Sequence, residues 1–362
     1  MLFSDHGLSA AQVSSLFVVW SITGFVFEIP SGAWADTIDR RTLLALSGIA
    51  YTVAFTCWTA FPGYAGFAAG FALWGLSGAL MSGTFEALVF DALAARSATS
   101  GYARLMGWAH SVAMAGVLAG TALGTPLYAW GGYPLVGWAS VGAAAVHTVL
   151  AWMLPTDRPV RADPEREPLT RRYGAMLRAG LREAARHGSV RAMIVIYALV
   201  FGLSAYDEYF PILARDAGAA TVDVPLLVGV MMLGQFAGTA LAGRTAAMPA
   251  RVMATLLATS AVLVSLGALG GGIAGVAAIT VGYGVLHNAI IVSEARLQQL
   301  IESDARATVT SVAGLSTEVV VLAVYATFAI GSAWLSVATL VALLGLPMLG
   351  VAVAARRRLP PV

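Results

Sequence analysis

The sequence predicts an all-α membrane protein, and three observations support this fold class: composition, the length of the apolar runs, and the placement of arginine. Of 362 residues, 59% are hydrophobic and only 11% are charged, against roughly a quarter charged in ordinary soluble domains. A soluble protein of this length could not bury so much apolar surface, whereas a lipid bilayer solvates it. The 39 glycines are expected where helices approach closely in lipid.

Apolar runs that are long enough to cross a bilayer need roughly 20 residues, and the chain contains eleven of them. Several are interrupted by Gly or Pro, which membrane helices tolerate when neighbouring groups satisfy the freed backbone. We therefore predict about 11 transmembrane helices, over residues 10–35, 42–61, 64–93, 105–129, 134–154, 192–213, 225–242, 252–269, 273–292, 308–330 and 335–353.

The arginines lie almost entirely in alternate connections between these runs. Arg215 is the one exception among 21 basic residues, all of which are arginine. By the positive-inside rule, the arginine-rich loops and the C-terminus are cytoplasmic. The exclusive use of arginine is typical of GC-rich bacterial genomes, so we expect a multi-pass protein of the bacterial inner membrane. The odd number of spans then places Met1 outside the cell, although residues 1–9 carry no basic export signal.

The longest connection, residues 155–191, divides the chain into two helical bundles. It is polar and rich in Arg and Pro, and its later part has the basic amphipathic character of a segment that lies on a membrane surface. We predict an N-terminal bundle of five spans over residues 1–154, a cytoplasmic loop over 155–191, and a C-terminal bundle of six spans over 192–362.

The two halves resemble each other at an offset of about 203 residues. In the first half Asp91 ends a span and Arg104 opens the next one, and in the second half Glu294 and Arg306 repeat this arrangement. Parallel repeats of this kind are typical of transporters, in which the substrate path lies between the halves.

The first cytoplasmic loop carries the most specific motif, and it follows a membrane helix directly. It reads Gly32-Ala33-Trp34-Ala35-Asp36-Thr37-Ile38-Asp39-Arg40-Arg41. This stretch resembles the signature loop between helices two and three of the major facilitator superfamily, G-x-L-a-D-r-x-G-r-k. The residues that match in kind and spacing are Gly32, Ala35, Asp36, Arg40 and Arg41, whereas Trp34 replaces the usual Leu and Asp39 replaces the second Gly.

The resemblance implies a two-bundle fold of the superfamily type and transport by alternating access. In the family, contacts of this loop with the neighbouring helix end latch one gating conformation. The resemblance therefore assigns a cytoplasmic gate motif to Gly32, Asp36, Arg40, Arg41 and Asp91. The alternative is that the two arginines only fix topology. Family members have twelve spans with both ends inside, so the resemblance also implies that the first helix is missing here, through a truncated gene model or in an eleven-helix variant.

Five carboxylates lie within the predicted spans: Glu28, Glu86, Asp207, Glu208 and Glu318. Each ionisable group in a bilayer costs about 2.5–3.5 kcal/mol on the insertion scale, so each needs a structural or functional reason. In four of the five cases, a Gly or Ser precedes the carboxylate by four residues and shares its helix face. Small residues of this kind mark helix contacts or the wall of a cavity.

A carboxylate that is shielded from water can bind and release a proton near neutral pH, which coupling to a proton gradient requires. Glu318, near mid-span, and Glu86 are the leading candidates for this role. Asp207 and Glu208 lie toward the outer face and could instead serve an external gate. The alternative is that these acids bond structurally to backbone groups or helix ends. His110, His147 and His287 are isolated, and we expect them to be packing or hydrogen-bonding residues and not ligands.

The sequence thus predicts a secondary active transporter of small molecules, and in particular a proton-coupled efflux antiporter. We expect a monomer with a small-molecule substrate, protons and the lipid bilayer as partners, and no cofactor, metal or nucleic acid. One alternative is a symporter that imports a nutrient. The other is a membrane sensor or an intramembrane enzyme. A sensor should carry a sizeable soluble domain and an enzyme a catalytic constellation, and the sequence offers neither.

Overall fold

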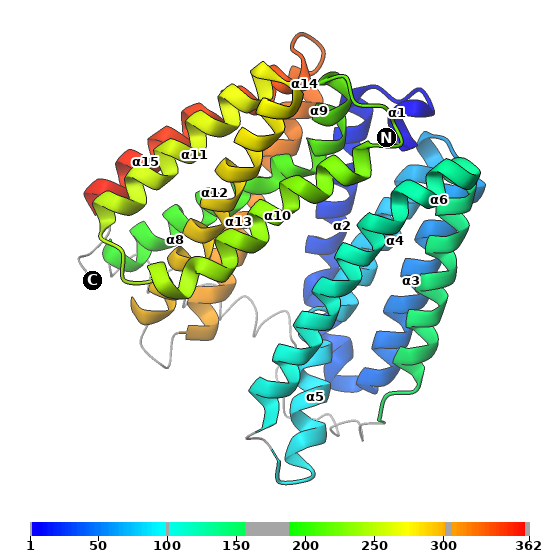
Figure 1. Ribbon diagram of the computed structural model, residues 1–362. Helices are drawn as coiled ribbons and strands as arrows, with labels where there is room; N and C mark the ends of the chain where they lie inside the picture. Colours follow the sequence, from blue (N-terminus) through cyan, green and yellow to red (C-terminus); the bar gives the residue numbers. More distant parts are fainter. Residues whose placement is uncertain (1, 99–100, 156–187, 301–305, 359–362) are drawn as a thin grey trace. The chain divides into compact units, whose positions relative to one another are not determined.

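The computed structural model describes residues 2–98, 101–155, 188–300 and 306–358, and their regular secondary structure is helical (Figure 1). The chain forms two compact units, here called the N-terminal unit (Leu2–Arg172) and the C-terminal unit (Tyr173–Val362). Most of the predicted loop 155–191 lies outside the described residues.

Two of the long helices of the N-terminal unit begin at side-chain caps. Ser9 accepts a hydrogen bond from the Gln12 N–H while the Gln12 side chain bonds back to the Ser9 N–H, which starts the second helix. Asp39 caps the third helix through the Thr42 N–H. The helices are α1 (Leu2–Asp5), α2 (Ala10–Thr37), α3 (Arg40–Ala60), α4 (Tyr64–Met81), α5 (Thr84–Ala94) and α6 (Tyr102–Trp152). Helix α4 packs against α2 and α3.

The predicted span 64–93 is a discontinuous helix. Helix α4 ends at Met81, and α5 begins at Thr84 after a short break. Gly83 adopts a φ of +68° in this break, a left-handed conformation that glycine reaches without steric cost. The side chains on either side of the break therefore point in directions that a continuous helix would not give them.

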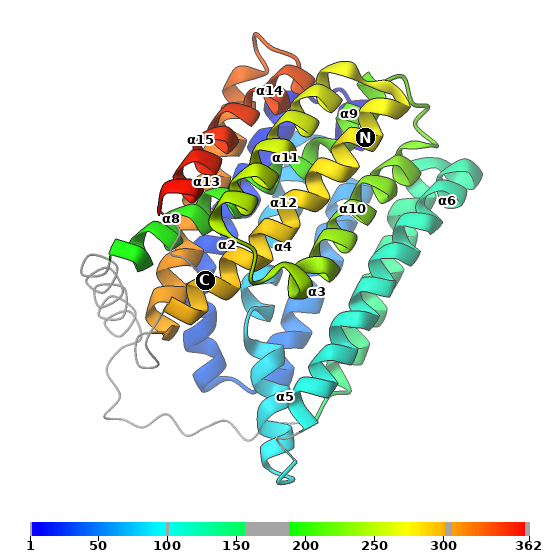
Figure 2. The same ribbon diagram turned by 60° about the vertical axis from the view of Figure 1, so that its left-hand side comes forward.

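Helix α6 contains two of the predicted spans, 105–129 and 134–154. Gly131 and Gly132 have non-helical dihedral angles inside it, and the chain reverses there, so that α6 consists of two arms that run in opposite directions (Figures 1 and 2). Ten helices of the described part are long and apolar enough to cross a membrane. Because one of them supplies two arms, this number agrees with the eleven predicted spans.

The two arms of α6 differ in how they pack within their unit. The second arm lies in close contact with α3: a Cβ on Gly48 would lie 2.6 Å from the Thr148 hydroxyl oxygen, and the hydroxyls of Thr52 and Thr148 are 3.2 Å apart. In the first arm, residues 111–120 are all exposed in this unit. Small residues thus bring the second arm close to its neighbour, as packing in lipid requires.

The C-terminal unit is built around α12, which contacts α8, α10 and α11. Its helices are α8 (Gly188–Gly202), the 3₁₀ helix η2 (Leu203–Tyr209), α9 (Phe210–Asp216), α10 (Val224–Thr245), α11 (Ala250–Gly270), α12 (Gly272–Leu300), α13 (Arg306–Gly331), α14 (Val337–Leu343) and α15 (Gly345–Arg358).

Helices α10 and α12 meet in backbone contact. A Cβ on Gly238 would lie 1.8 Å from the Gly284 carbonyl oxygen, and one on Gly234 would lie 1.9 Å from that of Thr280. The Asn288 amide group also donates to the Gly238 carbonyl over 2.9 Å. This pair of helices therefore depends on glycine at two positions one turn apart.

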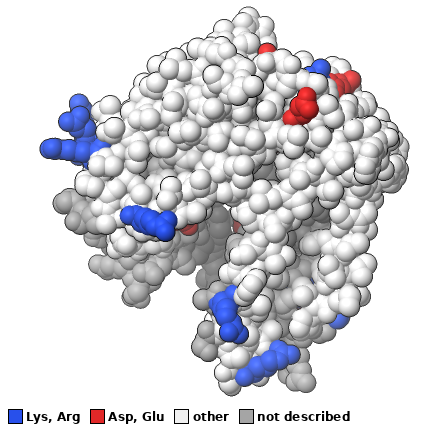
Figure 3. All heavy atoms as spheres, in the orientation of Figure 1, with Lys and Arg blue, Asp and Glu red and all other residues white. Residues whose placement is uncertain are grey.

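Charge separates along the C-terminal unit. Most exposed arginines lie where α10 and α15 end and α11 begins; exposed acids lie at the opposite end, where α9 ends and α10 begins, together with the exposed Arg215. Figure 3 shows that most of the visible surface is white and that charged side chains occupy a few small groups, one of which holds both red and blue spheres. The prediction that the arginine-rich loops are cytoplasmic rests on this distribution of arginine. The orientation of the protein in a membrane stays a prediction.

Candidate functional site

The predicted acid pair lies where a span of the C-terminal unit is discontinuous. The chain runs from α8 into seven residues of 3₁₀ helix, η2, and then into α9, although such runs rarely exceed three or four residues. Pro211 explains the break, because it has no N–H to donate to the Asp207 carbonyl. That carbonyl accepts instead from the Phe210 N–H, in the tighter 3₁₀ pattern. Asp207 and Glu208 are thus placed on irregular backbone.

Asp207 is held by a tyrosine of a neighbouring helix. The Tyr283 hydroxyl on α12 donates to its carboxylate over 2.5 Å; Asp207 is half-buried and Tyr283 is buried. The Tyr283 ring packs edge-on against His287 at a centroid distance of 4.4 Å and against Tyr206 at 5.7 Å. Both of these neighbours carry a buried polar atom, His287 Nε2 and the Tyr206 hydroxyl, that has no hydrogen-bond partner among the described residues.

Two further acids, Glu208 and Glu318, lie near a second tyrosine, Tyr325 of α13. Tyr325 is buried and lies within electrostatic range of Glu208, Asp207 and Glu318. Glu208 and Glu318 are both half-buried. The C-terminal unit therefore brings three of the five predicted acids together around Tyr283 and Tyr325, a group that we call the acid–tyrosine cluster.

The other two acids lie at the break of the N-terminal unit. Ser82, which caps the end of α4, donates to Glu28 on α2 over 3.0 Å. Glu86 occupies the first turn of α5, where the positive end of the helix dipole favours a negative charge. Both carboxylates are exposed within this unit. Acidic side chains thus lie at the break between α4 and α5 as well as at the break between α8 and α9.

The structure pairs two residues of the predicted gate motif. Arg40 forms an ion pair with Asp91 and also donates to the Ala87 carbonyl over 3.4 Å. The Arg41 guanidinium lies 5.3 Å from the centre of the Trp152 ring, a cation–π contact. Gly32 and Asp36 belong to α2, but their surroundings lie outside the described part. The role of the motif in gating stays a prediction.

Some members of the acid–tyrosine cluster have no signature in the sequence. Tyr283 is one aromatic residue in an apolar run, and its ring neighbour His287, which lies beside the cluster, was expected to be a packing or hydrogen-bonding residue. Their spacing of four residues, which places them on one face of α12, was the available signal. This spacing indicates a site only once the structure shows that the face of α12 with Tyr283 contacts Asp207. Among the described residues, no group of three or more His, Cys, Asp or Glu side chains could hold a metal ion.

Comparisons with known proteins bear on this arrangement. A family model described as Major Facilitator Superfamily matches residues 1–323. A D-xylose–proton symporter is similar in structure, with a TM-score of 0.71 and 14% identity over 99% of this chain and 91% of that one. The nucleoside transporter NupG has a TM-score of 0.70 and 10% identity, over 98% and 91%.

A bacterial homologue of the human lysosomal transporter Spinster, solved in an inward-facing and unoccupied conformation, has a TM-score of 0.65 and 16% identity over 96% of this chain and 87% of that one. No curated protein matches the sequence. At these identities the structural likeness shows a shared fold and carries no information about the substrate.

Proposed function

This chain belongs to the major facilitator superfamily, and we propose that it is a proton-coupled antiporter that exports a small molecule and uses the acid–tyrosine cluster for coupling. The family match confirms the predicted family and fold class. It makes the chain a multi-pass secondary transporter of small molecules, and not an enzyme. The coupling ion, the direction of transport and the residues involved are the proposal.

The observation that carries the proposal is the hydrogen bond from Tyr283 to Asp207 at a break in a membrane-spanning segment. Irregular backbone at membrane depth occurs where it is buried in protein or lines a water-filled cavity. Transporters place substrate and coupling-ion sites at such discontinuous helices. The hydrogen bond between Asp207 and Tyr283 changes when the carboxylate takes up a proton. The ionised carboxylate can only accept hydrogen bonds, whereas the protonated form can also donate one.

Protonation therefore gives η2 and α12 two different interactions. An equilibrium between two conformations shifts only when a ligand interacts differently with each of them, and the proton meets this condition at Asp207. Glu208 and Glu318, which like Asp207 lie within electrostatic range of Tyr325, are two further carboxyl groups that could exchange a proton nearby.

Antiport follows from competition for the same acids. No arginine lies within the predicted spans that contain these residues, so a cationic substrate would meet negative charge there without a competing side chain. A proton and such a cation neutralise the same carboxylates and exclude each other. With protons entering down their gradient, this exchange moves the cation out of the cell.

The test begins with a panel of toxic organic cations in a bacterium that lacks its own efflux pumps. The wild-type protein should raise resistance to some of them, and Asp207→Asn should abolish that resistance at an equal amount of protein in the membrane. Tyr283→Phe should weaken it. Tyr64→Phe is the matched control, because it removes a tyrosine hydroxyl that contacts Ser15 at 2.9 Å in the other unit, and it should have no effect.

Proteoliposomes with a defined pH gradient then decide the coupling. If the Asp207→Asn protein still concentrates substrate against its gradient and responds unchanged to collapse of the pH gradient, Asp207 is not the coupling acid. Glu318→Gln, the leading candidate from the sequence, is the next variant to test. Substrate and proton movement in the same direction would establish the symport alternative and end the antiport proposal.

A further inference from the structure

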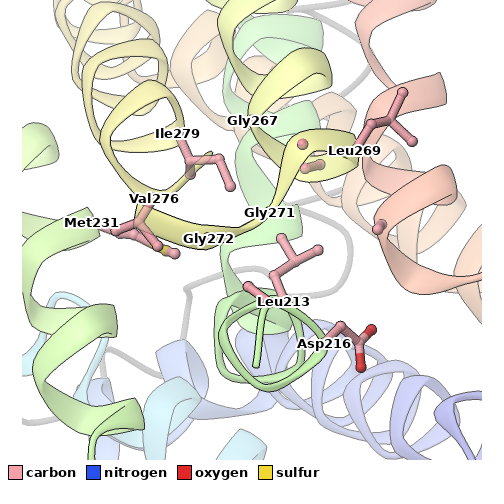
Figure 4. A pocket seen from close by; sticks show the side chains of 13 residues that line it. Leu213, Asp216, Met231, Gly267, Leu269, Gly271, Gly272, Val276 and Ile279 are labelled. Atoms are coloured by element: carbon pink, nitrogen blue, oxygen red, sulfur yellow. The ribbon is translucent and has the colours of Figure 1, made fainter. Parts of the chain in front are cut away.

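A pocket of about 290 Å³ lies at the end of the C-terminal unit that carries the exposed acids. Figure 4 shows Leu213 and Asp216 of α9 on one side of it and Met231 of α10 on another. Ile279 of α12 and Ala338 of α14 complete the wall. Asp207 and Glu208 do not line this pocket, so it is separate from the acid–tyrosine cluster.

The turn between α11 and α12 fixes one wall of the pocket. Gly271 and Gly272 both have left-handed dihedral angles, with φ of +59° and +60°, which residues with a side chain rarely adopt. This allows α12 to begin directly after α11 ends. A Cβ on Gly271 would lie 3.7 Å from Ala217, so the turn lies against the residue that follows Asp216.

The electrostatics of the pocket favour a positive ligand. Asp216 is the one charged side chain among the lining residues; the neighbouring Arg215 interacts with it electrostatically but does not line the pocket.

We propose that this pocket binds a small organic cation, whose charged head pairs with Asp216 while its apolar part contacts Leu213, Met231 and Ile279. The volume is at the lower end of the range for small-molecule pockets, which suits a ligand of the size of benzyltrimethylammonium. A divalent metal ion is a poor fit, because calcium requires six to eight oxygen ligands and the lining offers one carboxylate among apolar side chains.

The test uses a cysteine placed in the pocket wall. Cys57 is replaced by Ser and Ala338 by Cys, and the rate at which an alkylating reagent modifies position 338 is measured in detergent-solubilised protein at constant ionic strength. Benzyltrimethylammonium should slow alkylation in a saturable way. Its uncharged analogue neopentylbenzene, which has nearly the same shape, should protect much less.

Asp216→Asn should raise the concentration that gives half-protection by about fivefold or more, since about fivefold corresponds to the attraction between two charges about 4 Å apart in bulk water. Asp223→Asn is the matched control: Asp223 is exposed at the same end of the unit but does not line the pocket, and half-protection should be unchanged. In a second arm, Ala338→Trp in the otherwise native protein should fill the pocket and abolish the binding of benzyltrimethylammonium by calorimetry.

Three results would overturn the proposal: no protection by the cation, equal protection by neopentylbenzene, or equal half-protection in the Asp216→Asn and Asp223→Asn proteins. Protection by sodium or calcium ions at the same concentration would assign the site to inorganic cations instead. The measurements use no ion gradient, so their failure leaves the proton-coupling proposal unaffected.

Discussion

Replacing Gly238 by Ala should destabilise the C-terminal unit strongly, although the change adds a single methyl group. The added Cβ would lie 1.8 Å from the Gly284 carbonyl oxygen and 2.6 Å from its carbonyl carbon. Both atoms belong to backbone, so no side-chain rotation relieves the overlap. Helices α10 and α12 must move apart, and the bond from Asn288 to the Gly238 carbonyl stretches as they do.

The magnitude follows from these contacts. Overpacking of a well-packed interior costs roughly 1–3 kcal/mol, and a hydrogen bond between membrane helices contributes about 0.6 kcal/mol. We therefore expect a loss of about 2–4 kcal/mol. At about 2–4 °C per kcal/mol for a unit of this size, the midpoint of thermal unfolding should fall by roughly 5–15 °C.

Gly243 on the same helix is the matched control, because a Cβ there meets nothing within 4 Å. Gly243→Ala should be neutral or stabilise by up to about 1 kcal/mol, since alanine is the better helix former. The assay is the fraction of monodisperse detergent-solubilised protein that survives heating, read by size-exclusion chromatography. Equal midpoints for the two variants would refute the inferred backbone contact.

Three further predictions concern the ends of the helices. Arg40→Gln should cost at most about 1 kcal/mol, as for partly exposed ion pairs, and combining it with Asp91→Asn should not add to that loss in a double-mutant cycle of thermal stability. Ser9→Ala removes the cap of α2 and should cost roughly 1 kcal/mol, measured as a lower unfolding midpoint. With Cys57 replaced, Ala220→Cys should react with an impermeant thiol reagent in intact cells; reaction only after permeabilisation would reverse the predicted topology.

The number and class of the helices were predictable from the sequence because each span is a local property. A run of about 20 apolar residues is stable in hydrocarbon whatever its neighbours are. The reversal at Gly131 and Gly132 was predictable for the same reason, since it separates two such runs. The family motif is also local, and it led directly to the pairing of Arg40 with Asp91.

The breaks within spans were harder to predict, because a hydropathy pattern does not change when a helix tightens or kinks. Gly83 and Pro211 were present as signals, but membrane helices tolerate Gly and Pro inside continuous spans. Only the structure distinguishes a continuous helix from a broken one. The groups around the Gly or Pro decide whether the freed backbone groups find partners within a regular helix or in a 3₁₀ turn.

Helix neighbours were decided by the tertiary structure alone. In lipid all faces of a span can be apolar, so the pattern of side chains states that a helix crosses the membrane and not which helix lies beside it. Gly314, which shares a helix face with Glu318, meets nothing within 4 Å, whereas Gly238 is in backbone contact. Tyr283 reaches Asp207 across 76 positions of sequence. Composition and run length determined that this protein is a bundle of membrane helices, and packing between helices determined which acidic side chains acquire partners.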